Sequence, residues 1–163
     1  FRFIFTKNNK MKFDILKNNC SNILENNELK FEDKLLEICK ILKNEIEYYD
    51  WIGFYFKNGN KEELILGPYA GEPTDHTIIP FGKGICGQVA VSNKNFVVED
   101  VTAQDNYISC NFNVKSEIVI PLFVNGENIG QIDIDSNTLK AFGKEDELFL
   151  EWLNNEISKI YNS

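Results

Sequence analysis

The hydrophobic residues of this chain change their spacing along the sequence, and this change restricts the fold more than any other feature. Apolar residues recur every three or four positions over residues 11–26 and 31–49, and again from Leu148 to Ile160. This spacing predicts amphipathic helices at both ends of the chain. Between them lie short aromatic and aliphatic runs, separated by turn sequences, which predict strands. The chain is therefore expected to be an α+β protein.

Two pairs of the predicted strands are joined by tight turns. Residues 51–56 and 63–69 flank the sequence KNGN, and residues 116–124 and 129–136 flank NGEN. Tight hairpins require antiparallel pairing. The remaining predicted elements are strands at 76–81 and 95–100, a short helix at 85–92 and an irregular loop at 101–115. We expect one antiparallel sheet, with the N- and C-terminal helices packed on one face and loops plus the short helix on the other.

Length and charge limit the number of domains and the class of partner. The chain has 163 residues and a formal net charge of −8. Residues 11–163 are expected to form a single domain, and residues 1–10 to be an upstream addition. An acidic chain has no electrostatic footprint for nucleic acid or for an anionic membrane. With no long apolar segment and no secretory signal, we expect a cytoplasmic protein.

The cysteines fall into two groups. Cys20 and Cys39 lie on the apolar stripes of predicted helices and are expected to be inert core thiols. Cys86 and Cys110 lie in glycine- and asparagine-rich loop sequences, where reactive thiols tend to occur. No CxxC pair is present and His76 is the single histidine, so no zinc site and no disulfide framework are expected.

The sequence FGKGICG contains the pattern GxGxxG at residues 82–87. A dinucleotide site would require an opening parallel βαβ unit, and this motif instead lies among hairpins. A tight turn into a short helix is favoured, with Cys86 near a helix N-terminus that would stabilise its thiolate. The sequence DIDSN at 133–137 does not continue as a calcium loop, because Thr138 and Lys144 stand where glycine and glutamate are needed.

Three acidic residues could form either a solvated surface or a pocket. Asp133 and Asp135 are two residues apart on a predicted strand, so they share a face, and Glu117 begins the partner strand. In a pocket, crowded carboxylates would raise a pKa or require a cation such as a substrate ammonium. Trp51 and Tyr55 also share a face. They are either core residues or an apolar wall for a small methyl-bearing ligand.

These motifs together resemble a known family. The run from Gly67 to Ala90, then VVEDV, ISCNFNVKSEIVIPL and NIGQIDIDS, is similar to the GAF-domain enzymes that reduce free methionine-(R)-sulfoxide. The resemblance covers residues 51–136 closely and implies a GAF-like fold.

The resemblance also implies roles for particular residues. It makes Cys110 the nucleophile and Cys86 a second redox cysteine. It makes Trp51, Tyr55, Glu117, Asp133 and Asp135 the substrate-binding residues. Many family members have a third cysteine ten residues before Cys86, whereas this chain has His76. Oxidised Cys110 would then be resolved by Cys86 or by a thiol from another molecule.

The implied reaction is reduction of the free sulfoxide by Cys110, with Glu117 or Asp135 as the acid, a sulfenic acid intermediate and a disulfide. The resemblance further implies thioredoxin as reductant and a homodimer, and no metal or cofactor is expected. Two alternatives stay open: a GAF module that binds a small molecule without catalysis, and a redox sensor in which Cys86 and Cys110 only toggle.

Overall fold

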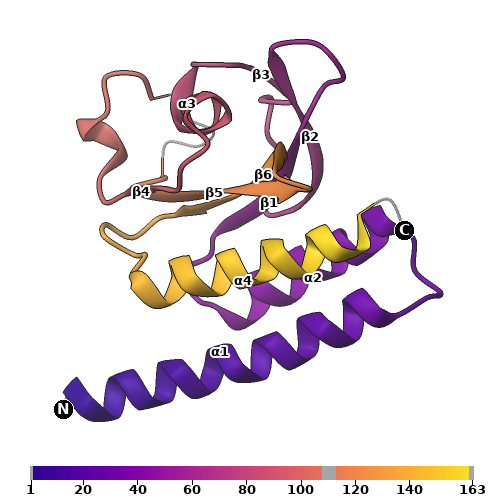
Figure 1. Ribbon diagram of the computed structural model, residues 1–163. Helices are drawn as coiled ribbons and strands as arrows, with labels where there is room; N and C mark the ends of the chain where they lie inside the picture. Colours follow the sequence, from indigo (N-terminus) through magenta and orange to yellow (C-terminus); the bar gives the residue numbers. More distant parts are fainter. Residues whose placement is uncertain (1, 108–112, 162–163) are drawn as a thin grey trace.

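An antiparallel sheet forms the centre of the protein (Figure 1). The computed structural model describes residues 2–107 and 113–161, with side chains from residue 8 onward. Within these ranges the sheet has six strands in the order β3-β2-β1-β6-β5-β4. The strands are β1 (Trp51–Lys57), β2 (Glu63–Ala70), β3 (Ile78–Pro80), β4 (Phe96–Val98), β5 (Ser116–Val124) and β6 (Glu127–Ser136). All adjacent strands pair antiparallel, as the hairpin sequences predicted.

The hairpin of β5 and β6 is tighter than the sequence NGEN suggested. Asn125 and Gly126 both have positive φ, 52° and 79°, which is the geometry of a two-residue type I′ turn. Asparagine and glycine tolerate this left-handed backbone better than other residues. Because the turn needs only these two residues, β6 begins at Glu127, two residues earlier than expected.

Three long helices lie on one side of the sheet. The helices are α1 (Arg2–Glu25), α2 (Phe31–Glu45) and α4 (Lys144–Ile160). In Figure 1, α2 and α4 lie directly beneath the strands, and α1 forms a further layer below them. Helix α1 continues upstream of the expected start at residue 11. The expectation that residues 1–10 are an upstream addition stays a prediction.

The predicted end of the second helix was wrong by four residues. Helix α2 ends at Glu45, and Ile46 takes an extended conformation while its N–H donates to the carbonyl of Leu42. Ile46 and Tyr49 are still buried in the core. The apolar spacing continues past the helix because the connecting segment packs into the same core.

The two faces of the sheet bury different side chains. Ile118, Ile132 and Ile134 pack against the long helices in the larger core. Val119, on the other face, packs beneath the short helix α3 (Gly84–Ser92) together with Cys86. This arrangement confirms the predicted fold class, with terminal helices on one face and loops plus a short helix on the other.

Cys20 and Cys39 are core thiols, as predicted. Both side chains are fully buried among the helices. Burial raises the pKa of Cys20 to about 12 and raises that of Cys39 further above its ordinary value. Both are therefore protonated and unreactive at neutral pH. None of the described helices is long and apolar enough to cross a membrane.

Candidate functional site

Strand pairing brings the three acidic residues together on the face that carries α3. Glu117 pairs with Asp135 across β5 and β6, and Asp133 lies two residues from Asp135 on the same face. Ile132 and Ile134 point into the opposite core, as alternation along a strand requires. The acids are not solvated, because Glu117 is 5% exposed and both aspartates are 2% exposed. This burial contradicts the solvated-surface interpretation and favours the pocket interpretation.

Helix α3 covers these acids and brings Cys86 to them. The turn that precedes the helix uses Gly82 and Gly84, whose φ angles are 81° and 60°. These left-handed residues allow the chain to turn sharply from β3 into α3. Cys86 Sγ lies 3.9 Å from Glu117 Oε1, and the thiol donates to this carboxyl group. Cys86, Glu117 and Asp133 each offer one donor atom within 4.8 Å of the other two, and we call them the Cys86–Glu117–Asp133 cluster.

Burial and like charge make every group of this site hard to ionise. Burial raises the pKa of Glu117 well above its usual value, and the charges of Asp133 and Asp135 raise it further. Burial also raises the pKa of Asp133, to about 6, although hydrogen bonds from Glu117 and Cys86 lower it again in part. The pKa of Asp135 is raised by burial and then by the charges of Asp133 and Asp50. Such a site favours protons or a bound cation.

The predicted stabilisation of a Cys86 thiolate was wrong. Cys86 does lie in the first turn of α3, where the helix dipole favours a negative charge. Burial nevertheless raises the pKa of this thiol well above its ordinary value, and the charges of Asp133 and Glu117 raise it further. Desolvation and the three acids outweigh the helix dipole, so Cys86 is a protonated thiol at neutral pH.

The acids lack a basic partner in the part of the chain that the structure describes. The ion pairs found there all join surface residues of α2, α4 and the β1–β2 turn. Asp133 Oδ1 is buried and accepts no hydrogen bond from any described residue. A buried oxygen without a donor is costly, so a cation or donor bound at this position would stabilise the site.

Aromatic side chains, which we call the aromatic wall, lie on the same face as the acids; Trp51 is 7% exposed, whereas Tyr55 is fully buried in the core beneath α3. Trp51 pairs with Asp135 across β1 and β6, which places both on this face. The ring of Trp51 stacks on Tyr69 at 5.5 Å between centroids and lies 6.3 Å from Tyr55. Trp51 Nε1 donates to the carbonyl of Glu72 at 3.1 Å, and the Tyr55 hydroxyl donates to that of His76 at 2.9 Å. The aromatic wall therefore also holds the segment between β2 and β3.

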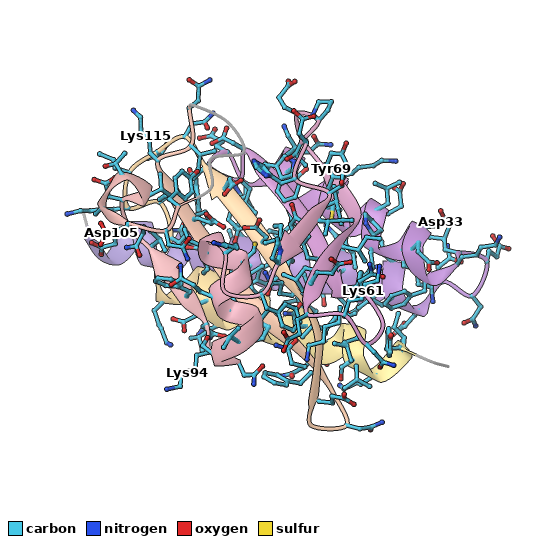
Figure 2. All side chains as sticks on the ribbon, turned by 90° about the horizontal axis from the view of Figure 1, so that it is seen from above. Asp33, Lys61, Tyr69, Lys94, Asp105 and Lys115 are labelled. Carbon is cyan, nitrogen blue, oxygen red and sulfur yellow. The ribbon has the colours of Figure 1, made fainter. Side chains whose placement is uncertain are left out.

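A pocket of about 460 Å³ opens next to the acids. Trp51 and Asp135 line it, together with Lys43 from α2. This volume lies in the range of about 300–1,000 Å³ that is typical of small-molecule sites. A smaller cavity on the other side of the acids is lined by His76, Cys86, Glu117 and Asp133. Figure 2 looks down onto the side of the sheet that carries α3: Lys115, just before β5, lies at one edge of the molecule, and Lys94, after α3, lies toward the opposite edge.

Two residues of the site were missed or left in doubt by the sequence. Gln131 is fully buried on the same face, and its Nε2 donates to the carbonyl of Cys86 at 3.2 Å. Gln131 lies two residues before Asp133 on the same strand, and this spacing could have predicted that the two side chains share a face. His76 was expected in a turn or at a pocket rim, and it lines the smaller cavity. Cys110, the predicted nucleophile, lies outside the described residues.

Comparison with known proteins places the chain in a family. The family model described as a GAF domain matches residues 31–159. The free methionine-R-sulfoxide reductase of Escherichia coli strain K12 is 34% identical over 152 residues, which make up 93% of this chain and 90% of that protein. The chain belongs to the GAF-domain free methionine-R-sulfoxide reductase family.

Two further comparisons support this family assignment. The Saccharomyces cerevisiae free methionine-R-sulfoxide reductase is 40% identical over 112 residues, 68% of this chain and 62% of that protein. The crystal structure of the Neisseria meningitidis free methionine-R-sulfoxide reductase, in complex with its substrate, is 32% identical with a TM-score of 0.85. The match covers 94% of this chain and 90% of that one. The GxGxxG pattern is therefore part of a GAF domain with an antiparallel sheet, not of a dinucleotide-binding fold.

Stability of this GAF domain is expected to fall with rising pH because of Asp133. Its pKa is 3.8 when unperturbed and about 6 in the folded protein, so the folded state holds a proton that the unfolded chain has lost. The free energy of unfolding should therefore decrease from about pH 4 to about pH 6, by up to about 3 kcal/mol. Denaturant unfolding at several pH values measures this loss. In the matched variant Asp133→Asn the decrease should be smaller, and equal pH slopes in both proteins would contradict the prediction.

Proposed function

We propose that this protein reduces free L-methionine (R)-sulfoxide to L-methionine, with Cys110 as the nucleophile. The single observation that carries the proposal is the buried group of Glu117, Asp133 and Asp135, which lacks a described basic partner. A free amino acid brings an ammonium group that can pair with these acids. A methionine sulfoxide within a polypeptide has no such group. The named relatives and the substrate-bound Neisseria meningitidis structure support the same substrate class.

The proposed substrate would place each of its groups against a different part of the site. Its ammonium would pair with the carboxylates, and its S-methyl group would contact the aromatic wall of Trp51 and Tyr55. The pocket beside Trp51 and Asp135 gives room for the rest of the amino acid. A protein-bound sulfoxide would leave the buried acids unpaired, which costs binding free energy and provides selectivity.

The reaction would proceed through two thiols. The Cys110 thiolate attacks the sulfoxide sulfur, and Glu117 or Asp135 protonates the departing oxygen. Both acids have raised pKa values because of burial, so each can hold the required proton near neutral pH. The oxygen then transfers from the substrate sulfur to Cys110 Sγ as the bond between the two sulfur atoms breaks, so that methionine leaves and Cys110 becomes a sulfenic acid. The sulfoxide is thereby reduced and the cysteine oxidised by two electrons.

Cys86 would complete the cycle by attacking the sulfenic acid. Its thiol first transfers a proton, and Glu117, whose Oε1 lies 3.9 Å from the sulfur, can accept it. A Cys86–Cys110 disulfide forms and water is released. A thioredoxin-class dithiol would then reduce the disulfide.

We also propose a homodimer through the outer helix α1. This is supported by Met11 and Ile15 of α1, whose side chains are more than half exposed.

Substrate selectivity tests this function directly. The purified protein is incubated with dithiothreitol and, separately, with the R and S epimers of free methionine sulfoxide and with N-acetylmethionine (R)-sulfoxide. Methionine release is expected from the free R epimer alone, because acetylation removes the ammonium group. Equal turnover of the acetylated compound would overturn the role of the acids. Binding of the free sulfoxide without turnover would instead favour a GAF module that senses a small molecule.

A further inference from the structure

The Cys86–Glu117–Asp133 cluster carries the donor atoms of a metal site. We propose that these three side chains bind a divalent transition-metal ion of the zinc type. The proposed ligand of this site is a metal ion, whereas the proposed substrate is an amino acid. It depends on described residues only, and its existence does not require the protein to be a reductase.

The separations between the donor atoms suit such an ion. The three atoms lie within 4.8 Å of one another, and Cys86 Sγ is 3.9 Å from Glu117 Oε1. In a tetrahedral zinc site, with Zn–S near 2.3 Å and Zn–O near 2.0 Å, the sulfur and oxygen ligands are about 3.5 Å apart. The Cys86–Glu117 pair would therefore have to approach by roughly half an ångström, and a pair separated by the full 4.8 Å by roughly 1.3 Å, to reach bonding distance.

An unpartnered atom provides the second, independent observation. Asp133 is 2% exposed, and its Oδ1 accepts no hydrogen bond within residues 2–107 and 113–161. This oxygen belongs to a side chain that lines the small cavity together with Cys86 and Glu117. A bound cation would satisfy it and would relieve the repulsion among the acids.

The mixture of donors selects the class of metal. A thiolate together with carboxylates favours zinc or cobalt, whereas magnesium and calcium prefer oxygen ligands alone. Three protein ligands leave the fourth position of a tetrahedral site open. Binding is an exchange in which the ion displaces the proton of the Cys86 thiol and any proton held by the carboxyl groups of Glu117 and Asp133. Metal–sulfur and metal–oxygen bonds form, the protons pass to solvent, and no electrons are transferred.

Metal binding would oppose the proposed function. An ion in the cluster would occupy the acids that are assigned to the substrate ammonium, and it would hold the sulfur of Cys86 as a ligand. This consequence, unlike the site itself, rests on the proposed function. Zinc would then act as a reversible inhibitor that competes with the free amino acid sulfoxide.

Cobalt titration tests the site without any turnover. Added Co²⁺ should bind one ion per chain and give a thiolate-to-cobalt charge-transfer absorption in the near ultraviolet. The absorption should disappear in Cys86→Ser and remain in Cys110→Ser, which is the matched thiol control. Absorption that persists in Cys86→Ser, or that is lost only in Cys110→Ser, would overturn the assignment.

Zinc affinity, measured by competition with a chromogenic chelator, tests the carboxylate ligands. Loss of an outer-shell partner already weakens metal binding by about 10- to 100-fold, so loss of a ligand in Cys86→Ser should cost at least about 100-fold. The isosteric variants Glu117→Gln and Asp133→Asn should weaken binding at least about tenfold. Unchanged affinity in both amide variants would overturn the site. If zinc binds as expected but free methionine sulfoxide does not displace it, the metal site stands and the proposed placement of the ammonium fails.

Discussion

Replacing Cys110 with serine is expected to abolish reduction of free methionine (R)-sulfoxide, with a loss of at least about a thousandfold in kcat. The serine hydroxyl has a much higher pKa than a thiol and is a poor nucleophile toward sulfur, so the sulfenic acid cannot form. NADPH consumption in an assay coupled to thioredoxin and its reductase measures the loss. Turnover that persists in Cys110→Ser would remove Cys110 from the proposed role.

A second thiol variant and a binding measurement keep this result interpretable. Cys20 is fully buried on α1, in the core on the far side of the sheet, so Cys20→Ala should keep its kcat. The acids are intact in Cys110→Ser, and calorimetry should therefore still detect binding of the free sulfoxide. Loss of both binding and turnover would indicate misfolding rather than loss of the nucleophile.

Replacing Asp135 with asparagine is expected to reduce kcat/KM for the free R epimer by about 10- to 100-fold. In its protonated form Asp135 would donate a proton to the sulfoxide oxygen, and in its ionised form it would pair with the substrate ammonium. Hydrogen bonds to charged groups contribute about 1.5–3 kcal/mol, and the neutral amide can provide neither the proton nor the charge. Asp135 is 2% exposed and lines the pocket with Trp51, so solvent would screen this interaction only weakly. Steady-state kinetics with the free R epimer measures the change.

Thermal stability separates this effect from damage to the fold. Asp135 forms no ion pair within the described structure, so Asp135→Asn is not expected to lower Tm at neutral pH. Asp14→Asn, an equal change of charge at an exposed position on α1, is the matched control and should leave kcat/KM unchanged. Full activity of Asp135→Asn would contradict the assigned role of this acid.

Most of the fold could be predicted from local patterns. Helix and strand periods differ, and the sequence KNGN and the dipeptide Asn125–Gly126 mark hairpins, so the elements and their antiparallel pairing followed from the sequence. The end of α2 did not follow, because Ile46 and Tyr49 continue the apolar spacing of the helix. Local spacing cannot distinguish the last helical turn from a connecting segment that is buried in the same core.

The site was predicted in part. Alternation along β6 placed Asp133 and Asp135 on one face, but burial depends on what covers that face. The protonation state of Cys86 depends on the same packing. Its position at the start of α3 suggested a thiolate, whereas the neighbouring acids and the loss of solvent raise its pKa. The packing of α3 also makes Gln131 part of the site, because its side chain donates a hydrogen bond to the backbone of this helix.

The sequence by itself determined the α+β class, the two hairpins and the shared face of Asp133 and Asp135, because these depend on interactions between residues close in the chain or paired by short turns. Only the tertiary structure decided that Cys86, Glu117 and Asp133 meet in one buried cluster. Glu117 lies 31 residues after Cys86, and no local spacing joins them. Packing of α3 onto β5 and β6 removes water from all three side chains, and this desolvation turns scattered acids and a thiol into a site that favours a cation.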